Sequence, residues 1–470
     1  MEYKWTALSN TTIGTLMASL DRNIVVIALP TIAIDLHTSI LTLVWIALGY
    51  WIVTASVLLT FGRLADMFGR VKLYNIGFVL FTIGSALCSI SYSGEQLIIF
   101  RLVQSIGAAF LFSNSAAIIT DVFPEKERGK ALGLNQISIV IGSVIGLTLG
   151  GFLTSYLGWR SIFWINIPIG LFASIWAFTK LKELGTINKE KIDWFGNITL
   201  FGGLILLLIA ITFGSFQILN LFQIILFVLC SFILLLLFYI IEKKIDEPMF
   251  DFSLFKLKYF AHGIFAIFLN ALARGAFTLV MAFYLQGPSM NLNPLNAGIY
   301  LIPISLSLAI SAPISGWLYD RYNLRLIIPT GLLISAIGFL ILTTIGPKIS
   351  LYNGMLPLVL IGAGMGIFAS PNRASIMSSV PPYRRGVAAG ISTMLVMSGS
   401  SFSIGMVFLI FVQFMPSYQV QRIFVGSYTS ISNSNLFINN FINSLHFIFF
   451  MSAMLMIISI IPPLLRKFTK

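Results

Sequence analysis

Long apolar runs alternate along the chain with short polar segments that hold most of its charged and turn-forming residues. A helix needs about 20 mostly apolar residues to cross a membrane. When the chain is cut at its charge clusters and turn residues, fourteen runs of about that length or longer remain. We therefore predict an all-α membrane protein whose spans are 6–34, 43–61, 72–91, 96–120, 130–155, 161–179, 194–214, 219–241, 258–286, 295–318, 325–346, 354–378, 386–414 and 441–465.

The composition excludes a soluble protein. Hydrophobic residues make up 57% of the 470 and charged residues 10%, whereas soluble proteins carry about 25% charged residues. The same apolar content excludes a disordered chain. The first run is too long, and too polar in its middle, for a cleaved signal peptide. Cys88 and Cys230 lie in apolar runs, so we expect neither a disulfide framework nor a thiolate metal site.

The distribution of basic residues predicts the orientation. When the N-terminus is taken as cytoplasmic and each span crosses the membrane once, 22 of the 29 Lys and Arg residues lie in segments on the cytoplasmic side. The opposite segments hold Arg160, Lys348 and Arg422, and the remaining four lie inside spans. Because Lys and Arg concentrate on the cytoplasmic side, we predict a multi-pass plasma-membrane protein with both termini cytoplasmic. The net charge of +13 then indicates orientation in a lipid bilayer rather than binding to nucleic acid.

Two loops in the first half of the chain recur in the second half. FPEKERGKALG at 123–133 aligns without gaps with VPPYRRGVAAG at 380–390, with five identities at an offset of 257. GRLADMFGR at 62–70 aligns more weakly with GWLYDRYNLR at 316–325. The first six spans therefore repeat as the last six. The alternative is a chance similarity between basic loops.

The repeat predicts the domain organisation. We expect a six-helix half at 1–185, two inserted helices with their linkers at 186–250, and a second six-helix half at 251–470. Two homologous halves are typical of transporters, whose substrate site lies at the interface of the halves near the bilayer midplane.

Six motifs follow one another along the chain: L-D-x-x-I-V-x-x-A-L-P at 20–30, G-x-L-A-D-x-x-G-R at 62–70, R-x-x-Q-x-x-G at 101–107, G-x-x-x-G-x-x-x-G-G at 142–151, W-R-x-I-F-x-I-N-x-P-I-G at 159–170 and P-N-x-x-x-I-M-x-S-V-P-P-x-x-R-G at 371–386. With them the chain resembles the major facilitator superfamily, specifically its fourteen-helix drug/proton antiporter (multidrug efflux) branch. The resemblance covers essentially the whole chain. It implies the major facilitator fold, with 14 transmembrane helices.

The motif at 62–70 suggests a gate. Gly62 and Gly69 permit a tight turn and close helix approach, while Asp66 and Arg70 could pair or cap neighbouring helix ends. The resemblance implies a cytoplasmic gate latch, although Met67 stands where the family often has Arg. The alternative is an ordinary solvated turn. The second half carries a copy of the motif at Gly316, Asp320 and Arg321.

A stripe of small residues follows the span 130–155. Gly142, Gly146 and Gly150 recur every four residues, and Gly151 follows. Such spacing lets another helix backbone approach closely. The resemblance links this motif to antiport, but Leu147 stands where the family usually has Pro. The packing role survives that change, whereas the inference of antiport is weakened.

Asp21 is the only carboxylate deep within a predicted span. Ionisable groups inside a bilayer are costly and therefore usually functional. Desolvation favours the neutral form of a carboxyl, so Asp21 is the candidate proton-coupling residue. A structural ion pair with Arg22 or Arg101 is the alternative. The resemblance implies that Arg101 takes part in proton transfer beside Asp21.

Further polar residues inside spans are candidates for the substrate cavity. Gln104 shares the face of Arg101 by helical spacing. Asn270, Arg274 and Thr278 form an i, i+4, i+8 stripe that should face a cavity rather than lipid. Arg22 and Arg373 complete the set, although Arg373 is close enough to the cytoplasmic end to snorkel towards water.

The buried charges suggest the kind of cargo. Four arginines and one aspartate lie inside the predicted spans. An exporter of cations would be expected to carry additional cavity carboxylates. We therefore expect a neutral or anionic small molecule.

The sequence as a whole predicts a secondary active transporter that exports small organic compounds in exchange for protons, by alternating access. An importer or uniporter on the same fold, or a transporter-like substrate-sensing receptor, are the alternatives. No Walker motif, H-E-x-x-H or G-x-S-x-G occurs in the sequence, so we expect neither ATP-driven transport nor an enzyme, and no cofactor or metal. We expect a monomer, and a flexible outer loop at 415–440.

Overall fold

The computed structural model describes residues 2–185, 193–245, 248–322, 326–381, 384–424 and 435–465. Within them every regular element is a helix. Among these described residues, thirteen helical segments are long and apolar enough to cross a membrane, and the shorter apolar helix α14 occupies most of the predicted run 325–346. Every predicted span therefore coincides with one helix or with two successive helices. The prediction of an all-helical membrane protein is confirmed.

The chain forms two compact units. Unit 1 comprises Met1–Ile205 and Cys230–Phe250. Its helices are α1 (Tyr3–Asp35), α2 (Ile40–Phe68), α3 (Arg70–Ser89), α4 (Gly94–Val122), α5 (Glu125–Leu157), α6 (Ser161–Trp164) and α7 (Asn166–Lys180). The first half of α8 (Trp194–Ser215) and the second half of α9 (Leu221–Lys244) also belong to it.

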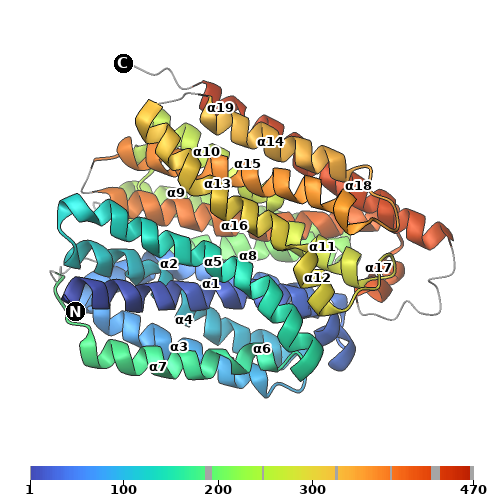
Figure 1. The fold of residues 1–470 in the computed structure, drawn as a ribbon, viewed down its shortest axis with the longest axis horizontal. Coiled ribbons are helices and arrows are strands. Elements are labelled where there is room, and N and C mark those ends of the chain that lie inside the picture. The colour runs from blue at the N-terminus through green and yellow to red at the C-terminus, as the bar shows by residue number, and fades with distance from the viewer. Residues whose placement is uncertain are drawn as a thin grey trace. The chain divides into compact units, whose positions relative to one another are not determined.

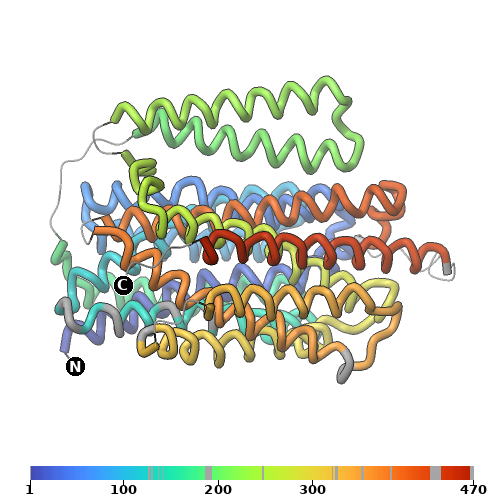
Figure 2. Tube along the Cα trace, turned by 90° about the horizontal axis from the view of Figure 1, so that it is seen from above, coloured from blue at the N-terminus to red at the C-terminus, as the bar shows by residue number. Residues whose placement is uncertain are grey.

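Unit 2 comprises Leu206–Leu229 and Asp251–Lys470. It holds the other halves of α8 and α9, followed by η1 (Phe252–Lys256), α10 (Lys258–Arg274), α11 (Phe277–Gln286), α12 (Pro294–Tyr300), α13 (Ile302–Tyr322), α14 (Ile327–Leu342), α15 (Leu351–Ser378), α16 (Arg385–Phe414), α17 (Ser417–Phe424), α18 (Asn435–Ile458) and α19 (Ile461–Leu464). Figure 2 shows α8 and α9, in two shades of green, as a hairpin of adjacent helices. The predicted boundaries at 185 and 250 stay a prediction.

The same helix pairings occur within each unit. In unit 1, α1 packs mainly on α5, α3 on α4 and α7, and α2 on α4, and Figure 1 shows α1 running beside α5. In unit 2, α10 packs on α16, α14 on α15 and α18, and α13 on α15. These pairings correspond one to one under the repeat seen in the sequence. An internal repeat explains the correspondence, since related sequences bury related faces.

Four predicted spans are interrupted. The run 161–179 divides into α6 and α7, 258–286 into α10 and α11, 295–318 into α12 and α13, and 441–465 into α18 and α19. The break after Arg274 has a visible cause. A Cβ at Gly275 would lie 2.8 Å from the backbone oxygen of Ser400, and Ser403 Oγ accepts the N–H of Ala276 at 2.9 Å. Hydropathy alone does not detect such local contacts.

The expectation of a loop throughout 415–440 is wrong. The short helix α17 occupies Ser417–Phe424, and α18 begins at Asn435; residues 425–434 lie outside the described part of the chain. Val420 and Ile423 are buried, whereas Gln421 and Arg422 are exposed. Apolar residues three positions apart bury one face of a helix, and this pattern is too short to stand out in a polar stretch.

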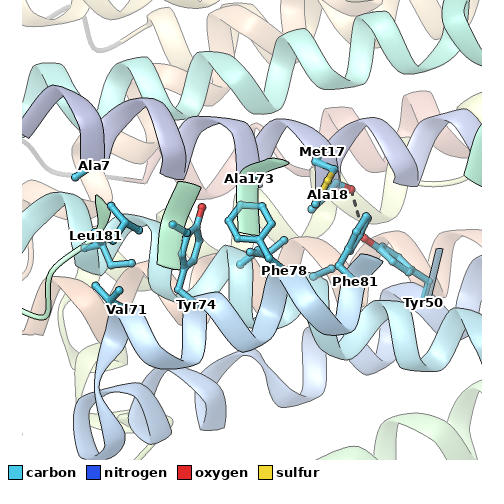
Figure 3. Packing of buried hydrophobic residues seen from close by; sticks show 14 residues of the cluster. Ala7, Met17, Ala18, Tyr50, Val71, Tyr74, Phe78, Phe81, Ala173 and Leu181 are labelled. Carbon is cyan, nitrogen blue, oxygen red and sulfur yellow. Dashed lines mark hydrogen bonds between the residues drawn. The ribbon is translucent and has the colours of Figure 1, made fainter. Parts of the chain in front are cut away.

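A buried cluster of unit 1 joins α1, α3, α4 and α7 (Figure 3). Its centre is aromatic: Phe78 and Phe81 of α3 are fully buried beneath small residues of α1 such as Ala18. Tyr50 of α2 lies at one end, where its hydroxyl donates to the backbone oxygen of Ala18 at 3.3 Å. Because lipid is as apolar as these side chains, close packing rather than exclusion of water stabilises the cluster.

Candidate functional site

Asp21 lies in the middle of α1 and is fully buried. Its Oδ2 accepts a hydrogen bond from Arg101 of α4, which is 1% exposed. Its Oδ1 accepts the Nδ2 of Asn166 at 2.8 Å and the Nε2 of Gln104 at 2.9 Å. Three helices, α1, α4 and α7, thus contribute to one ion pair. Both carboxylate oxygens of Asp21 therefore have hydrogen-bond donors.

The cation of the pair is equally enclosed. Arg101 also donates to Gln104 Oε1 at 2.6 Å. The Arg101 guanidinium carbon lies 4.1 Å from the centre of the Tyr50 ring, a favourable cation–π distance. Gln104 in turn donates to Ser85 of α3 at 2.7 Å. Arg101 Nε and Asn166 Oδ1 are buried and make no hydrogen bond, so the network is not saturated.

Local sequence features bring the network together. A Cβ on Gly84 would lie 2.7 Å from the Cα of Gln104, so the glycine lets α3 and α4 approach closely. The interruption between α6 and α7 places Asn166 in the first turn of α7. Sequence reasoning gave no role to Asn166, Ser85 or Tyr50. The available signal was the asparagine of the W-R-x-I-F-x-I-N motif.

Arg22 follows Asp21 in sequence but points elsewhere. Successive residues on a helix are separated by about 100°. The Arg22 guanidinium carbon lies 4.8 Å from the centre of the Trp51 ring, and its buried Nε makes no hydrogen bond. Of the two pairings considered for Asp21, the structure has the one with Arg101.

The gating motif holds a three-residue ion-pair network. Arg70 Nε lies 2.7 Å from Asp66 Oδ1, and its Nη1 lies 2.5 Å from Asp121 Oδ1 at the end of α4. Gly69 adopts φ +101° between α2 and α3, a conformation that favours glycine. The space around Gly62 is open to 4 Å, so Gly62 itself makes no close approach.

Glu183, which sequence reasoning did not select, caps α3. Its carboxylate accepts the backbone N–H groups of Arg70 and Val71 at 2.9 Å and of Lys72 at 3.3 Å. A carboxylate at a helix N-terminus satisfies free N–H groups and complements the helix dipole. The segment that follows α7 is therefore tied to the gating motif.

The second copy of the motif is only partly described. Arg321 lies over the rings of Trp317 and Tyr322, with centroid distances of 5.3 and 5.5 Å. A Cβ on Gly316 would lie 2.6 Å from Ser370 Oγ. The Asp320 side chain lies outside what the structure describes. In the other repeated loop, at 380–390, Arg384 forms an ion pair with Asp251 and donates to Ser253 Oγ at 2.8 Å.

The glycine stripe of α5 lies against α1. A Cβ on Gly142 would lie 2.7 Å from the backbone oxygen of Leu16, and one on Gly146 would lie 2.7 Å from that of Leu20. A Cβ on Gly150 would lie 2.7 Å from the side chains of Ile24 and Ile27. Gly151 is buried in the same helix. The glycines thus set the position of the α1 turn that carries Asp21.

The polar residues of unit 2 do not form one continuous helical stripe. Asn270 accepts from Arg274 Nε at 3.0 Å and donates to Met456 Sδ at 3.3 Å. Thr278 lies beyond the helix break, in α11. The expectation that Asn270, Arg274 and Thr278 share a single helix is therefore wrong. Arg373 of α15 is exposed.

The count of one buried carboxylate also needs correction. Glu242 at the end of α9 is 2% exposed and Asp193 before α8 is 6% exposed. The predicted span 219–241 ended one residue before Glu242, so its charge was assigned to a loop. Unit 2 has an open cleft of about 880 Å³ between α13, α14 and α15, lined by residues such as Ser311, Ile314 and Thr330. None of the predicted cavity residues lines this cleft.

Comparison with known proteins places this geometry in context. The model of the Major Facilitator Superfamily matches residues 11–404. The riboflavin transporter RibZ of Clostridioides difficile is 32% identical, over 93% of this chain and 95% of that protein. Multidrug resistance protein 3 of Bacillus subtilis is 31% identical, over 82% of this chain and 75% of that protein.

Solved structures agree on the fold. A bacterial homolog of the human lysosomal transporter Spinster superposes with a TM-score of 0.68 at 16% identity, covering 99% of this chain and 97% of that one. The POT family transporter PepTSo superposes with a TM-score of 0.68 at 15% identity, covering 98% of this chain and 97% of that one. The all-helical fold is thus that of major facilitator transporters. This chain belongs to the Major Facilitator Superfamily of multi-pass membrane transporters.

Proposed function

We propose that this transporter exports small organic compounds across the plasma membrane in exchange for protons, with both termini in the cytoplasm and a monomer as the working unit. The observation that carries the proposal is the fully buried Asp21, held by Arg101, Gln104 and Asn166. A group in this position can exchange a proton only if the network around it opens. Proton exchange would thus be linked to helix movement.

The coupling step follows from the ion pair. Protonation of Asp21 removes the electrostatic attraction between Asp21 of α1 and Arg101 of α4. Arg101 retains Gln104 Oε1 and the Tyr50 ring as partners, so α4 keeps its cation stabilised while α1 is released. Loss of the proton restores the pair. The two protonation states therefore favour two helix arrangements, which is the requirement for coupling.

The gating motif supplies a second element of the proposal. Arg70 joins Asp66 of α2 to Asp121 of α4. Half-buried ion pairs of this kind are of modest strength, so they are suited to a latch that breaks once per cycle. We propose that this network holds the cytoplasmic ends of α2, α3 and α4 together, and that it opens when the cavity faces the cytoplasm.

The cargo we propose is neutral or anionic. The Asp21 charge is already paired within the protein, whereas Arg22 is half-buried against Trp51 with its Nε free of hydrogen bonds. A guanidinium stacked on indole presents a flat, positively charged surface that suits anionic or aromatic groups. Glu242 lies near the C-terminal end of α9 and Asp193 directly precedes α8, and neither belongs to the hydrogen-bond network of Asp21.

The test is transport by the full-length protein in liposomes after a pH jump, with a panel of neutral, anionic and cationic compounds. We expect the substrate to move against its own gradient, in the direction opposite to proton flow. We expect this transport to be lost in Asp21→Asn. Glu95→Gln is the matched control, since Glu95 is an exposed carboxylate in the first turn of α4. Undiminished gradient-driven transport in Asp21→Asn would refute the assignment, and a clear preference for quaternary ammonium compounds would refute the cargo class.

Uptake of a metabolite is the second candidate. A metabolite as cargo is supported by the likeness to the riboflavin transporter RibZ over nearly the full length of both chains. Uptake in place of antiport is supported by Leu147 at the position where the antiporter motif usually has Pro. Riboflavin carries a flat, uncharged ring system, which suits stacking against the Arg22 guanidinium and the Trp51 ring that we propose as part of the substrate site. Labelled riboflavin in the same liposomes distinguishes the two: inward movement with the proton gradient favours import.

A further inference from the structure

Asn166 differs from the other partners of Asp21 in its unused hydrogen-bonding capacity. Its side chain is fully buried. Its Nδ2 donates to Asp21 Oδ1 at 2.8 Å, whereas its Oδ1 is buried and makes no hydrogen bond. Because a carboxylate only accepts hydrogen bonds, the amide nitrogen rather than the amide oxygen faces Asp21 in this state. The amide that binds the carboxylate therefore also carries an unused acceptor.

The other two partners of Asp21 have no such acceptor. Gln104 Nε2 donates to Asp21 Oδ1 at 2.9 Å and to Ser85 Oγ at 2.7 Å, and Gln104 Oε1 accepts from Arg101 at 2.6 Å. Turning the Gln104 amide would break all of these hydrogen bonds. Arg101 has donors and no acceptor, because its guanidinium stays charged. Of the three direct partners, Asn166 is therefore the one that can change from donor to acceptor.

A protonated Asp21 needs an acceptor that the charged form does not need. A buried acid O–H without an acceptor is destabilised, because it has lost its hydrogen bond to water and gained no replacement. The Cβ–Cγ torsion of asparagine is broad and roughly two-fold. A rotation of about half a turn therefore exchanges Asn166 Nδ2 and Oδ1. The Asn166 oxygen then lies where the nitrogen now contacts Asp21 Oδ1, and it can accept the acid proton.

The W-R-x-I-F-x-I-N motif attaches the segment that carries Asn166 to α1 at two points. Trp159 Nε1 and Arg160 Nη1 both donate to Asp35 Oδ2, at 2.8 and 2.7 Å. Asp35 is the last residue of α1, about 21 Å along the helix from Asp21. Asn166 makes the second attachment, in the middle of α1. Because the backbone around Asn166 is held in this way, only the amide group has to turn.

Few other titratable or charged side chains surround Asp21. Arg22 of α1 lies against a tryptophan ring, and Arg101 of α4 is the ion-pair partner. Tyr50 of α2 and Cys88 of α3 interact electrostatically with Asp21. In the described structure the Tyr50 hydroxyl donates to a backbone oxygen and the Cys88 thiol to Gln104, and neither bonds to Asp21. The segments 131–157 of α5 and 166–179 of α7 contain no Asp, Glu, Lys, Arg, His or Cys.

We propose that Asn166 is a positioning residue that hydrogen-bonds Asp21 in both of its protonation states. The inference rests on the proposed function, in which Asp21 takes up a proton from solvent. The proton binds to Asp21 Oδ1 and neutralises the carboxylate, whereas Arg101 donates to Oδ2. The Asn166 amide turns, and its Oδ1 accepts the new O–H. Return of the proton to solvent reverses both changes, so the cycle needs no other reactant.

Infrared difference spectroscopy of the full-length protein in liposomes, titrated from acid to alkaline pH, tests the role of Asn166. The acid band of Asp21 is the protonated-carboxyl band that Asp21→Asn lacks. In Asn166→Leu this band should move to higher wavenumber, because a hydrogen bond from a carboxylic acid lowers its C=O stretching frequency. Asn10→Leu is the matched control, since Asn10 is also fully buried and joins α1 to α7 by donating to the Ala173 backbone oxygen at 3.2 Å. It should leave the band in place.

A second measurement needs no substitution of Asn166, and it decides alone if Asn166→Leu does not fold. Wild type that carries asparagine isotopically labelled at the side-chain carbonyl should show a labelled carbonyl band that shifts when Asp21 is protonated. Asp21→Asn should lack that shift.

Two results would overturn the proposal while leaving Asp21 as the proton-coupling residue. One is an Asp21 acid band at the wild-type wavenumber in Asn166→Leu. The other is a labelled asparagine carbonyl that does not respond to pH in wild type. If no acid band depends on Asp21 at all, the proposed function fails, and this inference fails with it.

Discussion

Arg70 and Asp121 lie 51 positions apart in the sequence, yet Arg70 Nη1 donates to Asp121 Oδ1 at 2.5 Å. Both side chains are partly exposed, at 24% and 18%. Asp66 shares the same guanidinium through Nε. The gating motif is therefore completed by a residue outside the motif, contributed by the end of α4.

A double-mutant cycle on Arg70→Ala and Asp121→Ala measures the strength of this contact. We expect a coupling energy of about 0.5–1 kcal/mol, because partly exposed ion pairs are screened by solvent. Thermal unfolding of the purified protein in detergent provides the readout. Additive effects of the two substitutions would show that the pair contributes nothing to stability.

Arg101→Ala should be strongly destabilising. It leaves Asp21 as an uncompensated buried charge, for which the expected cost is about 3–5 kcal/mol. Adding Asp21→Asn should recover much of that loss, since it removes the unpaired charge. Unfolding temperatures of the two single variants and the double variant test this. A double variant less stable than Arg101→Ala would contradict the buried ion pair as the cause.

Glu183→Ala should destabilise the start of α3. The substitution leaves the N–H groups of Arg70 and Val71 without their acceptor, at an expected cost of about 1 kcal/mol. Glu183→Gln keeps an acceptor oxygen and loses only the charge, so its effect should be smaller. Amide hydrogen exchange of the peptide covering residues 70–75 provides a local readout. Equal exchange in Ala, Gln and wild-type proteins would rule out the cap.

Gly146→Ala should loosen the contact between α1 and α5. The added Cβ would lie 2.7 Å from the Leu20 backbone oxygen, and such overpacking costs about 1–3 kcal/mol. Gly133→Ala in the same helix is the matched control, because nothing lies within 4 Å of its Cβ position. That control should be neutral or slightly stabilising. If both variants unfold at the same temperature, the glycine stripe does not set helix spacing.

Part of the candidate site was accessible from the sequence. Asp21 stood out because a carboxylate is expensive in the middle of an apolar run, and Gln104 because it lies one helical turn from Arg101. Asn166 could be identified only as part of a sequence motif, and nothing in the sequence distinguished Tyr50 from the other aromatic residues. Their roles depend on which faces of α7 and α2 turn towards α1, and no local pattern in those helices fixes that rotation.

Burial of the charges was also decided by packing. The sequence treats Arg22, Arg101, Arg274 and Arg373 alike, as arginines within spans, whereas the structure buries Arg101, half-buries Arg22 and Arg274 and leaves Arg373 exposed. Glu242 shows the reverse case. It sits beside two lysines in sequence, which indicates a loop, but α9 extends through it and turns it inward.

The sequence by itself determined the helical class, the approximate limits of the apolar spans and the superfamily. The cost of exposing backbone polar groups and charges to lipid acts on every residue, so it leaves a pattern that can be recognised locally. The tertiary structure alone decided where helices are interrupted, which polar groups form hydrogen bonds with one another, and which charged side chains are buried. Those outcomes depend on contacts between residues tens to more than a hundred positions apart, such as Asp21 with Asn166, and therefore on how helix faces pack together.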